Sequence, residues 1–449
     1  MRKKQWFSSV DEFCAVFDDL PFPYIVVNSR EEVGSVKRLM VVVCVLFAVL
    51  IFAGENKLEI FSWWTGGGEE EGLLALFDLF HKYYPDVEII NAAVAGGAGT
   101  NAKAVLKTRM LGGNPPDSFQ VHAGMELIDT YVVTNMMEPI TWILKEMGVL
   151  DKFPKAILDI CSYNGEVYSI PVNVHRANVV FYNKKIAEEI GMTREPITWT
   201  EFIYYLKKAK EKGYVGLALG DKNKWTSLHL FESIMLAELG PDKYNALWKG
   251  ETSFNDLAIK KALEIMKELL EFINNDHAAM TWQDATRLVF EGKAFCNMMG
   301  DWAEGYLKTL GWTPGKEFGW FALPGTQNAF MVVSDTFGLP KGAPHRENAI
   351  KWLKLIASVE AQDVFNPIKG SIPARLDADK SKYDPYLTWS MNDFATKALC
   401  PSIIHGSAAP ESFATALMDA INTFVSTRNV ERTFQEILYI AEDNGYLTD

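Results

Sequence analysis

Residues 57–84 determine the fold class, and they read KLEIFSWWTGGGEEEGLLALFDLFHKYY. The alternation of apolar and polar residues from Lys57 to Phe61 predicts a strand. Three glycines then break the pattern, and residues 69–71 are acidic at the start of an apolar run. Acidic side chains in a first turn interact favourably with the helix dipole. The segment therefore predicts a strand followed by a helix.

The same alternation continues beyond this segment. Residues 87–94 predict a second strand, residues 102–111 a second helix and residues 117–121 a third strand. An Asn-Gly pair within residues 162–168 lies between strand-like flanks and predicts a β-hairpin. Strands that alternate with helices indicate an α/β fold, in which helices cover the faces of a central sheet.

A second unit of the same kind begins after Pro171. Thr198 and Glu201 have the spacing of a capping box, which predicts a helix from there to about Gly213. Because a single core tends to divide beyond about 250–300 residues, the chain of 449 residues is expected to form two lobes. The remaining predicted elements are strands at 177–182, 293–299, 318–323 and 329–339, helices at 227–239, 257–274 and 282–291, and a mainly helical region from 344 with a turn-rich interruption at 366–375.

The composition restricts the class of partner. The formal net charge is −13 and the basic residues are scattered, so neither nucleic acid nor an anionic membrane surface is an expected partner. The chain also has 13 tryptophans, a large number for a side chain whose indole N–H needs a partner when it is buried. This enrichment indicates that aromatic rings are used in binding.

Common catalytic and cofactor motifs are absent from the sequence. The glycines at 96, 97 and 99 do not form the dinucleotide-binding pattern, and no phosphate loop, zinc-protease motif or nucleophile elbow is found. Asp377 and Asp379 begin like a calcium loop but lack its glycine. Seven scattered histidines do not predict a metal centre, and no cofactor is expected.

The N-terminal region has the pattern of an export signal. Residues 39–53 carry no charge, follow Lys37 and Arg38, and end at small residues suited to a signal peptidase. The run is shorter than the roughly 20 residues of a transmembrane helix, so a permanent anchor is the weaker alternative. We expect residues 36–54 to be a signal peptide, residues 1–35 to be a non-native upstream extension, and translation to start near Val33, Val36 or Met40.

The mature chain is therefore expected to be periplasmic or otherwise extracytoplasmic, without membrane insertion after signal removal. It retains Cys161, Cys296 and Cys400, of which at most one pair could form a disulfide. Their spacing predicts neither a zinc site nor a catalytic thiol.

Aromatic and polar residues follow the predicted strands of the first unit. Trp63 and Trp64 come at the end of the first strand, immediately before the glycines, where ligand crevices of α/β sheets form. Because neighbours on a strand face opposite ways, we expect Trp63 to pack inside and Trp64 to contact a ligand. Gln120 and His122 share one strand face at the end of the third strand, although a structural role for the histidine is the alternative.

Further candidates lie where the second unit begins and beyond it. His175 stands where the chain passes between the two units, and Asp301 and Trp302 occupy a strand-to-helix turn. The alternative for Asp301 is a helix N-cap, and both roles can hold because the carboxylate has two oxygens. Lys369 and His405 lie in turn-rich segments, where plain surface exposure is the alternative. Sugars expose hydroxyls and an apolar C–H face, so aromatic and polar residues together favour a sugar site.

Several longer segments carry a resemblance to a known family: residues 60–64, 104–113, 120–126, 299–302, 365–371 and 405–406. In this order they resemble the solute-binding proteins of carbohydrate ABC transporters, in particular the glucose-binding proteins of the maltose-binding group. The resemblance spans nearly all of the mature chain.

The resemblance implies a two-lobe periplasmic-binding-protein fold of type II, in which crossing strands form a hinge between two sheets flanked by helices. The implied lobes are residues 55–168 with 326–374, and residues 169–325 with 375–449. The residues implied to contact the ligand are Trp64, Gln120, His122, Asp301, Lys369 and His405, with Glu69 as a further contact and Trp225 and Trp248 as stacking platforms.

The expected function is a monomeric receptor that binds a monosaccharide such as glucose or galactose in the inter-lobe cleft and delivers it to the membrane permease of an ABC importer. Binding of a disaccharide or oligosaccharide is one alternative, and a sensory role for the bound receptor is another. A secreted glycosidase is a third, but it needs two facing acids about 5–10 Å apart, and the candidate site supplies one. No catalytic residue is therefore predicted.

Overall fold

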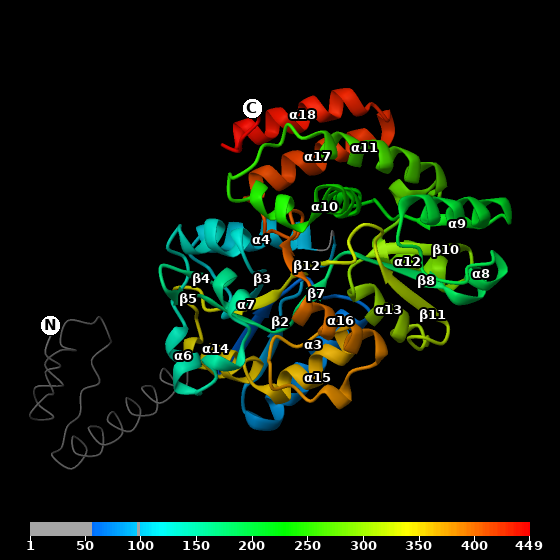
Figure 1. Ribbon diagram of the computed structural model, residues 1–449. Coiled ribbons are helices and arrows are strands. Elements are labelled where there is room, and N and C mark those ends of the chain that lie inside the picture. Colours follow the sequence, from blue (N-terminus) through cyan, green and yellow to red (C-terminus); the bar gives the residue numbers. More distant parts are fainter. Residues whose placement is uncertain (1–55, 97–98) are drawn as a thin grey trace, which may run out of the picture. The chain divides into compact units, whose positions relative to one another are not determined.

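The structure is a computed structural model that describes residues 56–96 and 99–449 (Figure 1). The predicted signal peptide and upstream extension lie outside the described residues. Within the described part, no helix combines the length and apolar character needed to cross a membrane.

A five-stranded sheet, here called the first sheet, has the strand order β2-β1-β3-β13-β6. β1 runs parallel to β2 and β3, whereas β13 runs antiparallel to β3 and β6. Its strands are β1 (Lys57–Phe61), β2 (Glu88–Asn91), β3 (Ser118–His122), β6 (Ser169–Pro171) and β13 (Asp335–Gly338). The helices of this part are α3 (Gly68–Tyr83), α4 (Thr100–Leu111), α5 (Met125–Leu127), α6 (Thr141–Glu146), α7 (Lys155–Ile160), α14 (Arg346–Ile356) and α15 (Val359–Lys369).

A four-stranded sheet, the second sheet, has the order β11-β8-β10-β9. β8 is antiparallel to both of its neighbours, and β10 is parallel to β9. Its strands are β8 (Val179–Asn183), β9 (Val215–Ala218), β10 (Ala294–Met299) and β11 (Phe318–Ala322). The helices of this part are α8 (Lys184–Glu189), α9 (Trp199–Glu211), α12 (Trp282–Phe290), α13 (Trp302–Thr309) and α16 (Pro385–Thr396).

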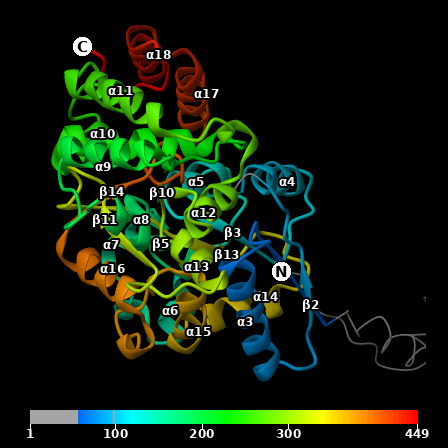
Figure 2. The same cartoon turned by 90° about the vertical axis from the view of Figure 1, so that its right-hand side faces the viewer.

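Four helices form a layer over the second sheet. They are α10 (Trp225–Leu247), α11 (Leu257–Leu269), α17 (Glu411–Thr427) and α18 (Val430–Asp443). α10 packs against both α11 and α17. Figures 1 and 2 show this layer at one end of the described chain and the packed pair α3 and α15 at the other. Two large apolar clusters form the core. One fills the first part and continues along one face of the second sheet, where Phe181 and Phe318 belong to it, and the other fills the opposite face and the helical layer.

The two sheets are connected by three crossing segments of the chain. β6 leads through β7 (His175–Arg176) into β8, and β12 (Ala329–Val333) leads into β13. β12 also pairs with β7 and with β14 (Ala398–Pro401) in a small three-stranded sheet. A third crossing follows α15, where Ile372 and Val174 exchange backbone hydrogen bonds of 2.8 and 3.0 Å. The α/β fold with two sheets, flanking helices and crossing strands is thus confirmed.

Local turn and cap signals are also confirmed. β4 (Ser162–Tyr163) and β5 (Glu166–Val167) form the predicted hairpin, with positive φ angles at Asn164 and Gly165. The capping box at Thr198 is present at the start of α9. These signals depend on neighbouring residues only, so they can be predicted without knowledge of the tertiary fold.

The prediction of one strand over residues 329–339 was wrong. Ser334 divides the segment into β12 and β13, which belong to different sheets. The hydroxyl of Ser334 donates to the Asn173 carbonyl at 2.7 Å, and the Asp335 N–H donates to Asn173 Oδ1 at 2.8 Å. These bonds hold two crossing segments together at the point where the chain changes sheets, and an apolar run does not reveal such a change.

The turn-rich interruption also begins later than predicted. α15 continues through Pro367 to Lys369 and ends at Gly370, which has a left-handed backbone with φ 80°. The N–H groups of Gly370 and Ser371 both donate to the Asn366 carbonyl. These hydrogen bonds satisfy the Asn366 carbonyl at the end of α15. The helix therefore tolerates Pro367 in its last turn.

Candidate ligand-binding site

A small cavity, here called the central cavity, lies where the crossing segments meet the carboxyl ends of β1 and β3. Residues from the first sheet, from the small three-stranded sheet and from the helices α3, α10, α12, α13 and α15 line it. They are Trp63, Trp64, Glu69, His122, His175, Trp225, Trp282, Trp302, Val333, Asp335, Lys369 and His405. Most of the predicted site residues therefore meet at one place, although they are spread over more than 300 positions of the chain.

His175 is held between two buried carboxylates. Its Nδ1 contacts Asp301 Oδ1, and its Nε2 lies 3.2 Å from Asp335 Oδ2. Burial and the Lys369 charge lower the pKa of His175, but the two carboxylates outweigh them and raise it. Burial raises the pKa of Asp335, yet the hydrogen bond and charge of His175 together with Lys369 bring it well below its ordinary value. The two carboxylates therefore make protonation of His175 more favourable than that of an ordinary histidine.

Asp301 does not cap helix α13. It occupies the N-cap position without a side-chain cap bond, and its Oδ2 accepts the Arg176 N–H at 2.9 Å. Both carboxylate oxygens are thus bound to β7, so the N-cap alternative was wrong. Asp301 is buried behind His175 and is not part of the cavity wall.

Gln120 is also buried behind the wall. Its Oε1 accepts the Trp63 N–H at 3.1 Å, and its Nε2 donates to Asp335 Oδ1 at 2.7 Å. Asp335 additionally accepts a 2.8 Å bond from Asn173. The amide therefore links the end of β1 to β13 and orients two residues of the wall.

Both tryptophans at the end of β1 belong to the wall, whereas only Trp64 was predicted to do so. β1 ends at Phe61, so the alternation of faces along a strand no longer applies to Trp63 and Trp64. Trp63 lies against the His122 ring with a centroid distance of 4.9 Å. Trp64 packs against Phe365, and its indole N–H has no acceptor among the described residues.

Lys369 is a buried cation at the cavity wall. Its Nζ donates to Glu69 Oε1 at 3.0 Å and lies 5.8 Å from the Trp64 ring centroid. The prediction placed Lys369 in a turn-rich loop, but it occupies the last turn of α15 because that helix extends to Gly370. Its position on a helix fixes the cation more firmly than a loop would.

Two neutral histidines complete the wall on the side of the helical layer. His405 Nε2 and His229 Nδ1 lie 3.1 Å apart. Burial, and then the neighbouring His229 and His122, hold the pKa of His405 well below its ordinary value, while burial lowers that of His229 to about 3. The two rings therefore share one N–H···N hydrogen bond. His405 also contacts Trp302 edge to face, with a centroid distance of 5.0 Å.

One group of described residues has the spacing of metal ligands: His229, Glu232 and His405 place ligand atoms within 4.8 Å of one another. Glu232 instead accepts hydrogen bonds from Ser402 Oγ at 2.7 Å and from the Ile403 N–H at 2.6 Å. Burial raises the pKa of Glu232 to about 8, although these bonds oppose the shift. The group is thus a hydrogen-bonded cluster that anchors the loop carrying His405.

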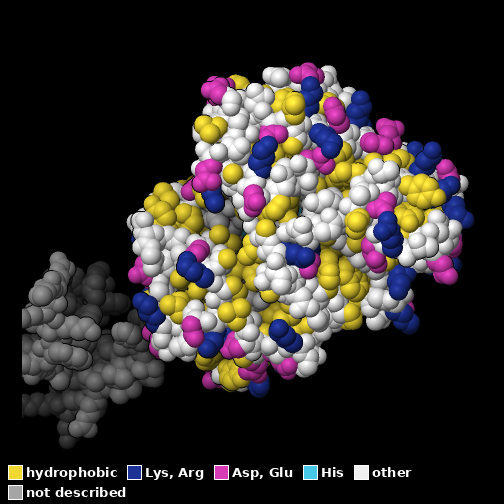
Figure 3. All heavy atoms as spheres, viewed as in Figure 1, with side chains coloured by type: hydrophobic (Ala, Val, Ile, Leu, Met, Phe, Trp, Pro, Cys, Tyr) yellow, Lys and Arg dark blue, Asp and Glu magenta, His cyan; other side chains and the backbone are white. Residues whose placement is uncertain are grey.

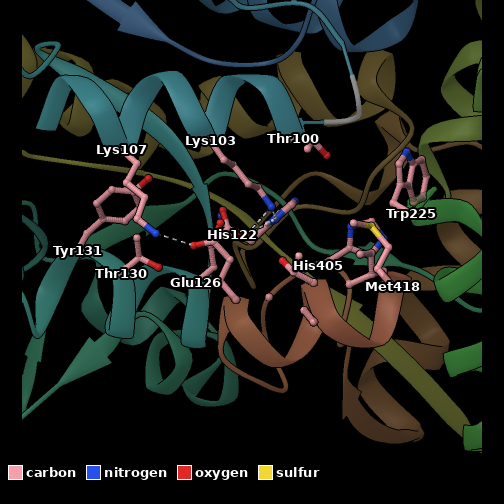
Figure 4. A pocket seen from close by; sticks show the side chains of 15 residues that line it. Thr100, Lys103, Lys107, His122, Glu126, Thr130, Tyr131, Trp225, His405 and Met418 are labelled. Carbon is pink, nitrogen blue, oxygen red and sulfur yellow. Dashed lines mark hydrogen bonds and ion pairs between the residues drawn. The ribbon is translucent and has the colours of Figure 1, made fainter. Parts of the chain in front are cut away.

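A second cavity, here called the side cavity, adjoins the central one and is shown in Figure 4. It is partly open to solvent and shares His122, Trp225 and His405 with the central cavity. Its other lining residues are Thr100, Lys103, Lys107, Glu126, Thr130, Tyr131, Ile404, Gly406, Glu411, Ala414, Thr415 and Met418.

Trp248 is the predicted site residue that lies farthest from this arrangement. It follows α10, packs against Tyr244, Phe254 and Phe413, and lines neither cavity. Trp225 begins the same helix and does line both. α10 consists of two helical segments that meet at a kink at Gly240, where φ is 73°, and Trp248 follows the second segment whereas Trp225 begins the first.

Four residues of the wall were not among the predicted contacts: Trp63, Trp282, Val333 and Asp335. Asp335 was the most detectable of them, because a single carboxylate in an otherwise apolar strand segment needs a buried partner. Trp282 gave no such signal, since it reads as the first apolar residue of an amphipathic helix.

Comparison with known proteins places the chain in a family. Residues 66–363 match the family model of the bacterial extracellular solute-binding protein. An uncharacterized ABC transporter extracellular-binding protein of Pyrococcus horikoshii is 43% identical over 386 residues, which cover 85% of this chain and 87% of that protein. A probable sugar-binding periplasmic protein of Mesorhizobium japonicum is 31% identical, with 83% and 90% covered.

A solved structure shows the same fold. It is a bacterial solute receptor with an exclusive substrate preference for β-D-galactopyranose, it matches with a TM-score of 0.76 at 21% identity, and the match covers 87% of this chain and 98% of that one. The family consists of binding proteins, so the chain is not an enzyme and the glycosidase alternative was wrong. With the family model matched over most of the chain, this protein belongs to the bacterial extracellular solute-binding proteins.

Proposed function

We propose that the chain is the extracytoplasmic sugar receptor of an ABC importer and that it encloses a neutral pyranose, such as glucose or galactose, in the central cavity. The observation that carries the proposal is the gathering of five indole rings and several polar side chains around one cavity. The sugar-binding name of the Mesorhizobium relative and the galactopyranose preference of the similar structure support it.

The two kinds of wall residue suit the two kinds of surface on a sugar. Indole faces remove the C–H face of a pyranose from water. Lys369 and Glu69 offer a charged donor and a charged acceptor to hydroxyls, and such hydrogen bonds are stronger than neutral ones. The unpaired N–H of Trp64 supplies one more donor in this wall.

The charges of the site favour an uncharged ligand. Lys369 is paired with Glu69, and His175 lies between Asp301 and Asp335. A phosphate or carboxylate on the ligand would have to disrupt one of these pairs, and breaking a buried ion pair is strongly unfavourable. Basic and acidic side chains are also interspersed on the face shown in Figure 3.

We further propose that residues 55–168 with 326–374 form one lobe and residues 169–325 with 375–449 the other. The ligand would contact both lobes only in the closed arrangement, so binding would shift a hinge equilibrium towards closure. In this proposal residues 36–54 direct export, and the closed, monomeric receptor delivers its sugar to the permease and its ATPases.

A thermal-shift screen over neutral monosaccharides tests this function, because a ligand selective for the folded state raises the unfolding temperature. At least one sugar should stabilise the wild-type protein. Trp64→Ala and Asp301→Asn should each weaken binding of that sugar at least tenfold, or about 1.4 kcal/mol. Trp142→Ala is the matched control, since Trp142 is exposed on α6. Unchanged affinity in both site variants would refute the proposed site.

A further inference from the structure

Glu304 is a buried acid on α13 that the proposed binding mode does not use. It lies three residues after Asp301, and its side chain is completely buried. Its Oε1 is 3.1 Å from Lys308 Nζ, in an ion-pair contact without hydrogen-bond geometry, and neither oxygen accepts a hydrogen bond from the part of the chain that the structure describes. An ionised carboxylate is unfavourable in such a place, because burial removes its water without supplying enough donors.

Lys308 also binds two other acceptors. Its Nζ donates to Asp384 Oδ2 and to the Pro367 carbonyl, both at 2.7 Å. Asp384 is the N-cap of α16, and its Oδ1 accepts the Leu387 N–H at 3.0 Å. One ammonium group thus faces two carboxyl groups, and it can balance the charge of only one of them. Two such groups ionise in separate steps, so one of them keeps its proton to higher pH.

The surroundings favour Glu304 as the group that keeps the proton. Burial raises the pKa of Glu304 well above its ordinary value, Lys308 opposes this shift, and the charge and hydrogen bond of Asp384 add to it. Burial also opposes ionisation of Asp384, but Lys308 and the hydrogen bond from Glu304 lower the pKa of Asp384. The neutral carboxyl group of Glu304 therefore donates to the Asp384 carboxylate.

The other charged or titratable groups around this contact do not supply a second cation to Glu304. Asp301, Lys369, Arg287 and Arg176 are each bonded to a partner elsewhere, and burial keeps the Tyr386 hydroxyl neutral by raising its pKa. These groups belong to the N-cap of α13, to α15, α12, β7 and α16, and Glu69 of α3 is the partner of Lys369.

The contact joins α13 to the last turn of α15. A Cβ atom at Gly370 would lie 2.8 Å from Glu304 Oε2, so the carboxyl group lies directly against the end of α15. Lys308 holds the same turn through the Pro367 carbonyl. Between these two points lies Lys369, the cation of the cavity wall. The two helices belong to different proposed lobes, so the contact lies where those lobes meet.

We propose that Glu304, with a neutral carboxyl group, is a positioning residue of the binding site, which holds the last turn of α15 on α13 and so fixes Lys369 and Asp301 relative to each other. The proposal rests on the proposed function, because it concerns groups that a bound sugar would depend on. When Glu304 loses its proton, two carboxylates and one ammonium group remain in the buried contact, and the uncompensated negative charge destabilises it. Ligand affinity should therefore be complete at low pH and fall as the pH rises through the range in which Glu304 ionises.

The test is a calorimetric titration, from pH 6 to pH 9.5, of the sugar that stabilises the wild type. Glu304→Gln keeps the size of the side chain and stays uncharged at every pH. Asp384→Asn is a second variant, since it leaves Lys308 to pair with an ionised Glu304, and asparagine can still cap α16. Glu347→Gln is the matched control, because Glu347 is exposed at the start of α14. The unfolding temperature of each protein is measured at the same pH values.

At pH 6 Glu304→Gln should bind the sugar within about threefold of the wild type. At pH 9.5 both Glu304→Gln and Asp384→Asn should bind it at least ten times as tightly as the wild type, whereas Glu347→Gln should follow the wild type throughout. Other groups of the site titrate in all four proteins and cancel in these ratios.

Two failures are distinguishable. If the wild type binds a sugar and the affinity ratios stay constant with pH, Glu304 is not a positioning residue, and the proposed function stands. The same conclusion follows if only the unfolding temperatures separate with pH, because ionisation of Glu304 then acts on the fold and not on the site. If no sugar binds the wild type at any pH, the proposed function is wrong and this inference is wrong with it.

Discussion

The imidazole of His175 joins three elements at the site. It contacts Asp301 before α13 and Asp335 on β13, while it belongs itself to the crossing strand β7. Because both ring nitrogens are bound to carboxylates, the imidazole is held from both sides and its ring has a fixed position in the cavity wall. The ion pairs of His175 with Asp301 and Asp335 therefore fix the position of the ring as well as the charge of the site.

Asp335→Asn tests this arrangement. Removing one carboxylate should lower the pKa of His175, because one of the two groups that raise it is lost. The stabilising effect of the charged ring is complete below its ordinary pKa of 6.5 and is lost as the pH rises through the raised value, so in the variant this loss should be complete at lower pH. An NMR titration of the histidine ring carbons measures the shift. Asp377→Asn is the control, because the Asp377 carboxylate contacts Arg375 and not His175, and it should leave the His175 titration unchanged.

Glu232→Gln tests the buried cluster behind His405. The folded protein keeps a proton on Glu232 up to about pH 8, whereas the ordinary value is 4.5. Between pH 4.5 and about pH 8 the folded state keeps the Glu232 proton that the unfolded state has released. The wild type therefore loses stability as the pH rises through this range. A glutamine does not ionise, so the unfolding temperature of the variant relative to the wild type should rise from pH 5 to pH 8. A constant difference across this range would contradict the raised pKa.

The sequence predicted which residues line the site better than it predicted the groups to which they are hydrogen-bonded. Trp64, His122, His175 and His405 were identified because aromatic and polar residues at strand ends or in loops are exposed to a crevice. The hydrogen bonds that bury Asp301 and Gln120 behind the wall join residues more than a hundred positions apart. No local pattern contains such a contact.

Among the elements, α15 and α13 approach each other most closely at Gly370. Its left-handed backbone ends α15, and a Cβ atom there would lie 2.4 Å from the Gly305 nitrogen and 2.8 Å from the Asp301 carbonyl oxygen. The close approach places Lys369 in the cavity wall and Asp301 behind it, next to His175. Glycine at this position therefore supports the site as well as the helix end.

Gly370→Ala should destabilise the protein much more than Gly113→Ala. Both glycines have positive φ, which alone costs an alanine about 1–2 kcal/mol. A Cβ at Gly113 would meet nothing within 4 Å, whereas the one at Gly370 would meet backbone that cannot move aside. Chemical denaturation of both variants measures the difference. Equal losses of stability would show that the packing of α13 against α15 does not matter.

Elements were predictable where their signals are local. The hairpin at Asn164 and the capping box at Thr198 each depend on a few neighbouring residues. The change of sheet at Ser334 and the extension of α15 past Pro367 depend on Asn173 and on the helix-end bonds to Asn366. Such tertiary contacts override the local preference of a sequence.

On the scale of the whole molecule, the crossing segments connect two sheets and place the cavities between elements of both. Wall residues come from β7, β12 and β13 as well as from the helices on either side. The side cavity extends from α4 and α5 of the first part to α17 of the helical layer. A ligand in either cavity would therefore contact residues of both proposed lobes.

The most direct measurement is isothermal titration calorimetry of the wild-type protein with neutral sugars and with their charged analogues glucuronate and glucose 6-phosphate. We expect a neutral sugar to bind one to one with micromolar or tighter affinity, or a free energy of about −8 kcal/mol or more favourable. Both charged analogues should bind at least ten times more weakly, because every charge in the site already has a partner. If no neutral sugar gives binding heat, or if a charged analogue binds more tightly than the neutral sugars, the central cavity is not a binding site for an uncharged carbohydrate.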